Sequence, residues 1–235
     1  MRSALTTVLR PFYEFVFPAV CFCCNAPLQP DEFKVCGQCW SLMKKVLPQD
    51  HLYQDTLAKL NARGIISTLV VAFYFEQDGP LQSLIHQLKY NGMSGLGVIL
   101  GKQAGMCFRS FLGNVPIDGI IPVPLHRTKA RERGYNQSEC LCKGVGLETG
   151  HLVFSSIVQR RKYTRSQTAL NVEERQKNVE DAFAIHPRSL ADVAGKSFLL
   201  VDDVITTGAT MHACAKTLID HGAQRIIACA VALAQ

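Results

Sequence analysis

The sequence predicts an α/β protein in which a mostly parallel sheet is flanked by helices, with a small cysteine-rich segment ahead of it. From about Ile65 onward, apolar and β-branched runs alternate with segments of helical periodicity, as in a parallel sheet. One such run ends in two adjacent carboxylates, Asp202 and Asp203, followed by a turn rich in threonine and glycine. Two CxxC pairs occur before residue 40. We therefore expect a zinc-binding segment over residues 1–50 and an α/β domain over residues 60–235.

Bulk composition is that of a globular chain. Of the 235 residues, 48% are hydrophobic and 19% are charged, which favours one sizeable core over disorder. The formal net charge is +6, and its excess lies in two segments, 126–137 and 160–178. Arg10, Pro11 and Glu14 interrupt any signal-peptide core, and no apolar run approaches the roughly 18 residues of a membrane span. We expect a cytoplasmic protein without a membrane span, possible association with the inner membrane coming only through partners.

The cysteine-rich segment has the spacing of a zinc site. Each CxxC presents two thiolates on one turn, and two such turns complete a tetrahedron around Zn²⁺. A full set of four cysteines leaves no open coordination position, so the zinc would be structural. A set that uses Cys23 in place of Cys24 remains open, as does the alternative of buried or redox cysteines without metal. The expected ligands are Cys21, Cys24, Cys36 and Cys39.

The remaining elements follow from periodicity and turn residues. A short helix is possible from Trp40 to Val46, and Leu81, Leu84, Ile85 and Leu88 have helical spacing that ends at Gly92. The strands are expected at 65–75, 119–123, 153–158, 197–201 and 225–233, and further helices at 96–111, 136–149 and 209–221. In such a sheet, ligands bind beyond the carboxyl ends of the strands.

The turn after Asp202 and Asp203 has the features of a phosphate site. A helix N-terminus offers N–H groups and a positive dipole end, while glycine allows close approach and threonine adds donors. Carboxylates beside a phosphate are explicable if they accept hydrogen bonds from sugar hydroxyls or act through Mg²⁺. The plainer alternative is a strand end followed by a helix cap. The turn consists of Thr206, Thr207, Gly208, Ala209 and Thr210.

This stretch resembles the phosphoribosyl pyrophosphate (PRPP) motif of type I phosphoribosyltransferases. The resemblance implies that Asp202 and Asp203 contact the ribose hydroxyls, and that residues 206–210 surround the 5′-phosphate. It also implies the fold of that family, in which the loop after the first core strand binds pyrophosphate and a long loop covers the site. The pyrophosphate-binding role would fall to a basic loop at residues 124–133, the covering role to residues 160–178, and the acceptor-binding hood to residues 65–111.

Further motifs resemble those of ComF proteins across nearly the whole chain. They are the KYNG turn at 89–92, the RGYNQ segment at 133–137, and the TRSQTAL segment at 164–170 with Arg175, Asn178 and Phe183 behind it. Many relatives carry a second cysteine group, which residues 49–60 lack, so we expect one zinc. The resemblance and the basic character together predict anion-binding roles for Lys89, Arg127, Arg131 and Arg133.

ComF-type proteins are associated with natural transformation, so the resemblance implies handling of incoming single-stranded DNA by a protein that binds PRPP with Mg²⁺. Partners in the DNA-uptake machinery would then be possible. Tyr135 and Tyr163 lie in the basic segments and could stack on bases. Two alternatives remain open. One is a phosphoribosyltransferase with an unknown acceptor, in which Asp202 and Asp203 would be catalytic; the other is a PRPP-responsive regulator without catalysis.

Overall fold

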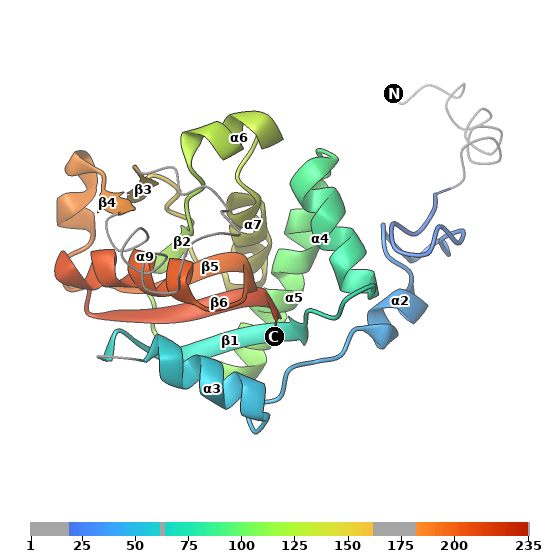
Figure 1. Ribbon diagram of the computed structural model, residues 1–235, viewed down its shortest axis with the longest axis horizontal. Coiled ribbons are helices and arrows are strands. Elements are labelled where there is room, and N and C mark those ends of the chain that lie inside the picture. Colours follow the sequence, from blue (N-terminus) through green and yellow to red (C-terminus); the bar gives the residue numbers. More distant parts are fainter. Residues whose placement is uncertain (1–18, 62–63, 162–181, 235) are drawn as a thin grey trace, which may run out of the picture.

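The computed structural model describes residues 19–61, 64–161 and 182–234. Its centre is a four-stranded parallel sheet in the order β1–β6–β5–β2 (Figure 1). The strands are β1 (Ile66–Tyr74), β2 (Gly119–Pro122), β5 (Ser197–Ile205) and β6 (Arg225–Leu233). Because all four strands are parallel, their carboxyl ends lie along one edge, where Ile205 pairs with Leu233. These strands are rich in β-branched and apolar side chains, which suits strands covered on both faces.

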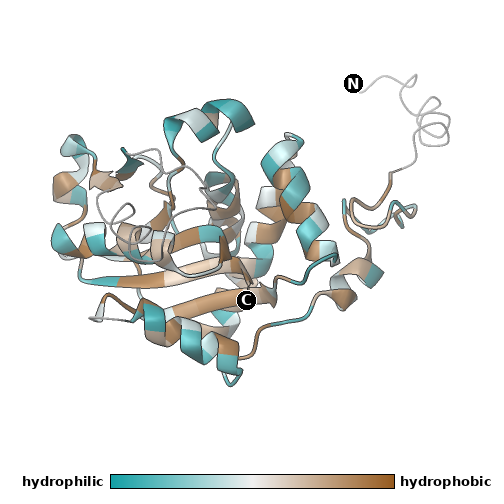
Figure 2. Ribbon diagram, in the orientation of Figure 1, coloured by the Kyte–Doolittle hydropathy of each residue, from teal (hydrophilic) through white to brown (hydrophobic). Residues whose placement is uncertain are grey.

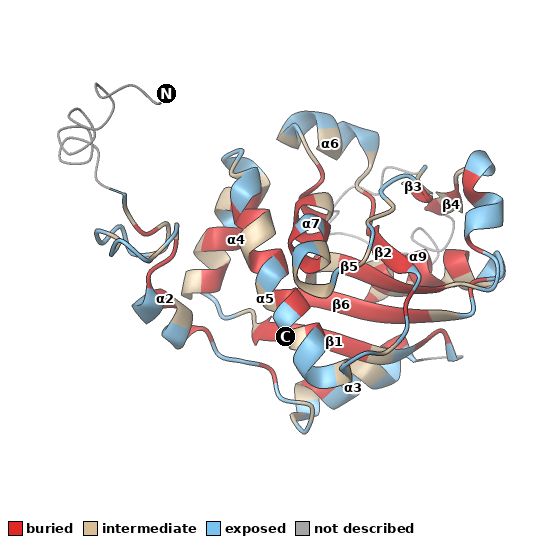
Figure 3. Ribbon diagram, turned by 180° about the vertical axis from the view of Figure 1, so that it is seen from behind, coloured by how far each residue is buried: buried red, intermediate tan, exposed pale blue. Residues whose placement is uncertain are grey.

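Helices cover both faces of the sheet. One face carries α4 (Pro80–Tyr90), α5 (Ser94–Leu112) and α7 (Gln137–Thr149), and the other carries α3 (His51–Leu60) and α9 (Ala209–Asp220). Figures 2 and 3 show the hydrophobic, buried residues concentrated on the strands and on the helix faces that cover them. Alternate residues of β5 divide between the two cores: Leu199 and Val201 belong to one, Leu200 to the other.

A close helix pair fixes the position of α7. A Cβ on Gly101 of α5 would lie 2.0 Å from the Leu141 carbonyl oxygen, and one on Gly144 of α7 would lie 2.1 Å from the Val98 carbonyl oxygen. Only glycine allows the two backbones to approach so closely. This packing holds the N-terminus of α7, with Ser138, beside the carboxyl end of β5, where Ser138 contacts Asp202.

The cysteine-rich segment packs against the same core. Its helix α2 (Gly37–Leu42) leads into an extended stretch, where the Val46 amide donates to the Ala72 carbonyl and Lys45 bridges Phe73 antiparallel to β1. The Gln87 side chain of α4 donates to the Phe22 carbonyl at 2.6 Å. The segment is therefore anchored by backbone and side-chain contacts to β1 and α4.

The structure departs from the expected elements in three places, and two other elements differ in their bounds. The helix expected from Trp40 to Val46 is instead α2, which ends at Leu42, and the strand expected at 197–201 continues through the acidic pair to Ile205. The strand expected at 153–158 is wrong as a unit, because Val153 makes only a single parallel bridge to Ile120 and the chain then turns at Ser155 and Ser156. The strand that follows, β3 (Val158–Arg160), pairs antiparallel with β4 (Phe183–Ile185) in a separate two-stranded sheet. Helix α3 lies at residues 51–60, where no helix was expected.

The third difference concerns the first basic segment, which was expected to be a loop. Its centre is the helix α6 (Arg127–Arg133), capped at its start by the His126 side chain, which accepts a hydrogen bond from the Thr128 amide at 3.2 Å. Alanine, arginine and glutamate within it favour a helix, and Gly134 ends it with a left-handed φ of 79°. A short 3₁₀ helix, η2 (Pro187–Asp192), connects β4 to the loop before β5. None of the described helices combines the length and apolar character needed to cross a bilayer.

Candidate functional site

The two carboxylates of β5 lie near its carboxyl end among partners from other elements. Asp202 is half-buried, and its Oδ1 accepts hydrogen bonds from the Ser138 hydroxyl and the Asp203 amide, both at 2.9 Å. Asp203 is buried; its Oδ1 accepts from the Val204 amide at 2.7 Å, and the Lys89 ammonium lies 3.0 Å from its Oδ2. The pair is therefore oriented from three elements: its own strand, α7 and α4.

The two adjacent carboxylates would be stabilised by additional positive charge or by additional hydrogen-bond donors. Burial and, to a lesser extent, the neighbouring Asp203 carboxylate raise the pKa of Asp202 to about 7, and its hydrogen bonds and Lys89 lower it only in part. Asp202 is therefore only partly ionised near neutral pH. A bound cation or a hydroxyl-rich ligand would stabilise the ionised form.

The Thr/Gly turn joins β5 to α9 as expected. Gly208 is the N-cap of α9 with a left-handed φ of 76°, and a Cβ there would lie 2.8 Å from the Leu60 Cδ2. The Ala209 amide donates only a long hydrogen bond of 3.4 Å to the Thr207 hydroxyl oxygen. Thr206 and Thr207 are exposed, and residues 209–212, the first turn of α9, contain no carboxylate. Hydroxyls and backbone N–H groups at this turn are available to an anion.

Cations of α6, β3 and α4 lie close to one another, and Arg160 and Lys89 among them interact with the acidic pair. The pKa of Lys129 is lowered by burial and by the nearby charges of Arg160, Arg133 and Lys89. Arg160 of β3 in turn interacts with the Asp202 carboxylate. Like charges that converge in this way indicate a surface suited to a polyanion.

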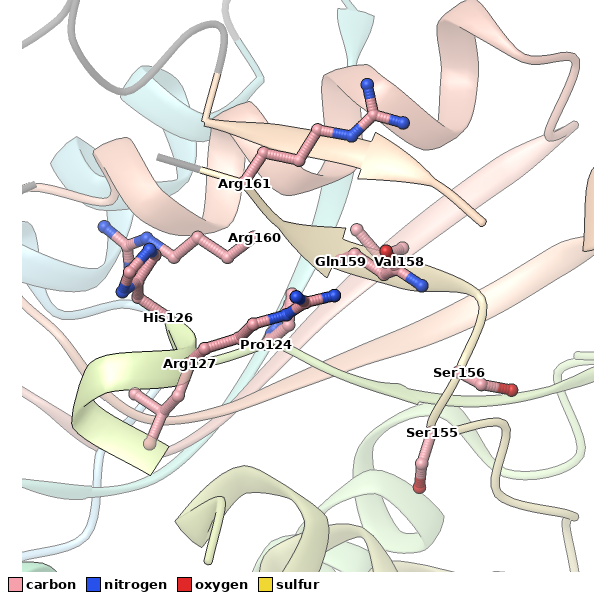
Figure 4. A pocket seen from close by; sticks show the side chains of 10 residues that line it. Pro124, His126, Arg127, Ser155, Ser156, Val158, Gln159, Arg160 and Arg161 are labelled. Carbon is pink, nitrogen blue, oxygen red and sulfur yellow. The ribbon is translucent and has the colours of Figure 1, made fainter. Parts of the chain in front are cut away.

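A pocket of about 640 Å³ lies beside the carboxyl end of β2. Its walls are the stretch from Pro124 to Arg127, Ser155 and Ser156, and the hairpin strand β3 (Figure 4). In Figure 4, Arg127 extends across the pocket toward Gln159, and Arg160 extends toward His126. The pocket therefore presents arginine side chains from both of its walls.

The structure brings together only some of the residues singled out from the sequence. Asp202, Asp203 and the 206–210 turn lie at the end of β5, and Lys89 contacts Asp203 directly. Its role toward an anion stays a prediction. Tyr135 is half-buried, and its hydroxyl donates to the Leu88 carbonyl, so this ring anchors α4. Tyr163 and most of the covering segment, 162–178, fall outside the described residues.

Two residues near the acidic pair were missed as individual contacts. Ser138 donates to Asp202 across 64 positions of sequence, and Arg160 reaches the pair from β3. Ser138 directly follows the RGYNQ segment and lies in the first turn of α7, whose N-cap is Asn136. A polar residue at the start of this helix was the sequence signal from which its contact with a strand end could have been predicted.

A second site is formed by four cysteines of the N-terminal segment. The sulfurs of Cys21, Cys24, Cys36 and Cys39 lie within 4.8 Å of one another, and those of Cys24 and Cys36 are 3.8 Å apart. Four sulfurs at about 2.3 Å from a tetrahedral Zn²⁺ are separated by roughly 3.8 Å, so the donor set fits this ion. Cys23 lies outside the cluster, with its thiol 3.6 Å from the Pro80 carbonyl.

Backbone amides stabilise the thiolate form of Cys21, whereas the pKa values of Cys36 and Cys39 are raised. The Cys36 amide donates to the Cys21 sulfur at 3.3 Å, and the Cys23 amide does so at 3.4 Å. Burial raises the pKa of Cys21, but these backbone hydrogen bonds outweigh it and bring the value to about 6. Metal ligands must be deprotonated, so the arrangement suits a cation.

Comparisons with known proteins agree with this geometry. A family model described as the phosphoribosyl transferase domain matches residues 145–235. The DNA utilization protein YhgH of Salmonella typhi is 28% identical over 220 residues, which cover 89% of this chain and 94% of that protein. Competence protein F of Haemophilus influenzae is 29% identical over 161 residues, covering 67% of this chain and 69% of its own. A solved glutamine PRPP amidotransferase from B. subtilis, complexed with ADP and GMP, has a TM-score of 0.41 at 16% identity, covering 61% of this chain and 30% of its own.

Proposed function

Because the chain is a ComF-family protein with a type I phosphoribosyltransferase-like fold, we propose that it binds PRPP with Mg²⁺ at the carboxyl end of β5 and handles single-stranded DNA during natural transformation. The observation that carries the PRPP site is the pair Asp202 and Asp203, held at the strand end directly before the Thr/Gly turn of α9. This juxtaposition supplies acceptors for sugar hydroxyls and donors for a phosphate within one short stretch of chain.

Each part of the ligand has a complementary group. The carboxylates would accept hydrogen bonds from the ribose 2′- and 3′-hydroxyls. The 5′-phosphate would lie on the turn from Thr206 to Thr210, where Gly208 leaves the backbone accessible. Lys129 and Arg133 of α6, with Arg160, would face the pyrophosphate, whose charge calls for cations.

The site also fits a divalent cation bound together with PRPP. Mg²⁺ prefers carboxylate and phosphate oxygens, and Asp202 has a raised pKa because its charge is incompletely compensated. Lys89 compensates Asp203 in the structure. When bound, Mg²⁺ would neutralise the pyrophosphate, while the protein orients the ribose through Asp202 and Asp203.

The PRPP site is tested by replacing Asp202 and Asp203 together with asparagine. Both side chains keep their size, so the fold should persist, while the acceptors lose their charge. Calorimetric titration with PRPP and Mg²⁺ should show binding to the wild type and loss of at least about tenfold in affinity in the variant. Unchanged affinity would refute the assignment of the site.

The role in DNA handling is supported by the names of the relatives, a competence protein and a DNA utilization protein, and by the basic character of the chain. Phosphate contacts release counterions, so affinity for single strands should fall steeply between about 50 and 200 mM salt. Anisotropy of a labelled oligothymidine would measure this. Affinity that does not change with salt would oppose the proposal. Contacts with the DNA-uptake machinery would then place the protein near the inner membrane.

Transfer of the phosphoribosyl group is a second candidate function, favoured by the arginine-lined pocket beside β2. Asp202 and Asp203 would then be catalytic through their hold on the ribose, and cations would stabilise the leaving pyrophosphate. Release of pyrophosphate in the presence of one of a panel of nucleobases would establish turnover. Tight PRPP binding without release would identify a PRPP-responsive regulator.

The four-cysteine cluster would hold one structural Zn²⁺. Four protein sulfurs complete the tetrahedron, which leaves no position for water or substrate. The cluster belongs to the same hydrophobic core as α4, so the ion would fix the N-terminal segment against the helix that carries Lys89.

A further inference from the structure

Tyr90 is an exposed aromatic residue at the end of α4, directly after the lysine that contacts the acidic pair. Its relative exposure is 65%, among the highest of the large hydrophobic side chains described. Its neighbour Lys89 forms the ion pair with Asp203. Tyr90 therefore follows directly after a residue of the proposed PRPP site, and most of its side chain is exposed.

The Tyr90 ring contacts a guanidinium group and a histidine ring. The Arg133 guanidinium lies 5.5 Å from the ring centroid, within the range of a cation–π interaction, and the His86 ring lies at 4.8 Å with an interplanar angle of 46°. Arg133 is itself held by a hydrogen bond to the Gln137 side chain at 2.9 Å. The ring is thus held in place by neighbours while most of it stays accessible.

The backbone around Tyr90 is fixed by the other tyrosine of this region. The Tyr135 hydroxyl donates to the Leu88 carbonyl at the end of α4. Figures 1 and 3 show the end of α4 beside α6 in both views. Tyr135 therefore works as an anchor that joins α4 to the end of α6, and Tyr90 remains as the accessible ring.

Helix α6, whose last residue Arg133 contacts the Tyr90 ring, is strongly basic. It carries four cationic residues and one glutamate within seven positions, buries none of its residues, and is drawn hydrophilic in Figure 2. In the part of the chain that the structure describes, these cations form no ion pair with a carboxylate of another element. Arg127 and Arg131 are exposed. A helix of closely spaced cations beside an accessible ring matches a phosphate backbone with an unstacked base.

We propose that Tyr90, supported by Arg133, is the stacking platform for a base of single-stranded DNA whose phosphates lie along α6. This inference rests on the proposed DNA-handling function and names the surface that performs it. A single strand is required because the bases of a duplex are already stacked on each other and cannot cover the ring. Since Lys89 precedes Tyr90, the strand passes next to the proposed PRPP site.

The test measures anisotropy of a labelled oligothymidine with the full-length, zinc-loaded protein and with Tyr90→Ala. The substitution should weaken binding about tenfold, as loss of one base stack does, and leave the salt slope unchanged because the phosphate contacts remain. Tyr90→Trp keeps an aromatic surface and should bind at least as tightly as the wild type. An abasic oligonucleotide of the same length should bind the wild type and Tyr90→Ala equally.

Phe111→Ala is the matched control. Phe111 is 45% exposed near the end of α5, which leads to the opposite edge of the sheet, where β2 begins. This variant should bind as the wild type does. If Tyr90→Ala binds oligothymidine with wild-type affinity, the stacking platform is refuted while the proposed function stands. If the wild type itself does not bind single strands, the DNA-handling function fails, and the inference fails with it. Unchanged PRPP binding in Tyr90→Ala shows that the variant is folded.

Discussion

Asp202 combines a half-buried position with a charge that its surroundings only partly compensate. Its folded-state pKa of about 7 lies above the roughly 3.9 of an unfolded aspartate, because burial and Asp203 oppose ionisation. Between these values the folded chain binds a proton that the unfolded chain has lost. The stability associated with this group is therefore fully present at low pH and is lost as pH rises through about 7. A site poised to gain a cation or hydroxyl donors makes the empty protein less stable.

Asp202→Asn should remove this dependence. The amide oxygen can still accept from Ser138 and from the Asp203 amide, so the hydrogen bonds survive. We expect the free energy of unfolding of the variant to exceed that of the wild type by a margin that grows from pH 5 to pH 8. Urea denaturation at unit pH intervals measures it. The exposed Asp192→Asn is the control and should show no growing margin; an identical pH dependence in all three proteins would contradict the account.

At the residue scale, the sequence predicts the roles of residues that depend on their immediate neighbours in the chain. Asp202, Asp203 and Gly208 stand in one stretch, and strand-end position plus turn chemistry suffices to single them out. Ser138 and the pairing of Lys89 with Asp203 depend on the packing of α7 and α4 against β5. Such partners lie far away in sequence, so only the folded arrangement reveals them.

Among the elements, α6 has the most direct consequence for anion binding. Its basic residues form one short helix that is capped by His126 at its start and ends at Gly134. The basic run was recognisable from composition, but its helical form depends on the His126 cap and on the left-handed Gly134. A loop would leave the spacing of these charges undefined, whereas a helix fixes it.

Arg131→Ala combined with Arg133→Ala should therefore weaken pyrophosphate binding about tenfold, since charge-assisted contacts to phosphate are lost. The thermal stability should change little because α6 buries none of its residues. Calorimetry with pyrophosphate and Mg²⁺ measures the affinity. Lys102→Ala combined with Arg188→Ala removes the same net charge from other exposed positions. Equal affinity in both double variants would assign α6 to a purely solvated surface.

The set of four clustered cysteines was predictable from the spacing of the two CxxC pairs alone. Two CxxC turns bring four sulfurs within bonding range of one ion, while Cys23 points to the Pro80 carbonyl. Its anchorage on β1 and α4 was not predictable, because it depends on unpaired backbone groups at the edge of β1.

Cys36→Ser should release zinc and destabilise the protein, whereas Cys23→Ser should retain it. Elemental analysis after dialysis should find about one zinc per wild-type chain. Loss of roughly 2 kcal/mol would lower Tm by about 4–8 °C in a chain of this size. Undiminished zinc in Cys36→Ser, or its loss in Cys23→Ser, would show that another set of ligands is used.

Taken as a whole, the molecule places its two unusual clusters on opposite ends of one helix. Helix α4 begins beside the cysteine segment, where Pro80 accepts from the Cys23 thiol, and ends with Lys89 on Asp203 and with the exposed Tyr90. The order of strands and helices could be predicted because each is marked by periodicity and turns. The β3–β4 hairpin could not, because Val158–Arg160 and Phe183–Ile185 are short and pair only with each other.

Calorimetric titration of the zinc-loaded protein with PRPP, with and without Mg²⁺, tests the central claim most directly. The account predicts saturable binding of one PRPP per chain that requires Mg²⁺, because a cation would stabilise the ionised form of Asp202 and neutralise the pyrophosphate. The absence of saturable binding under both conditions would contradict it, and would show that the acidic pair and the Thr/Gly turn do not form a PRPP site.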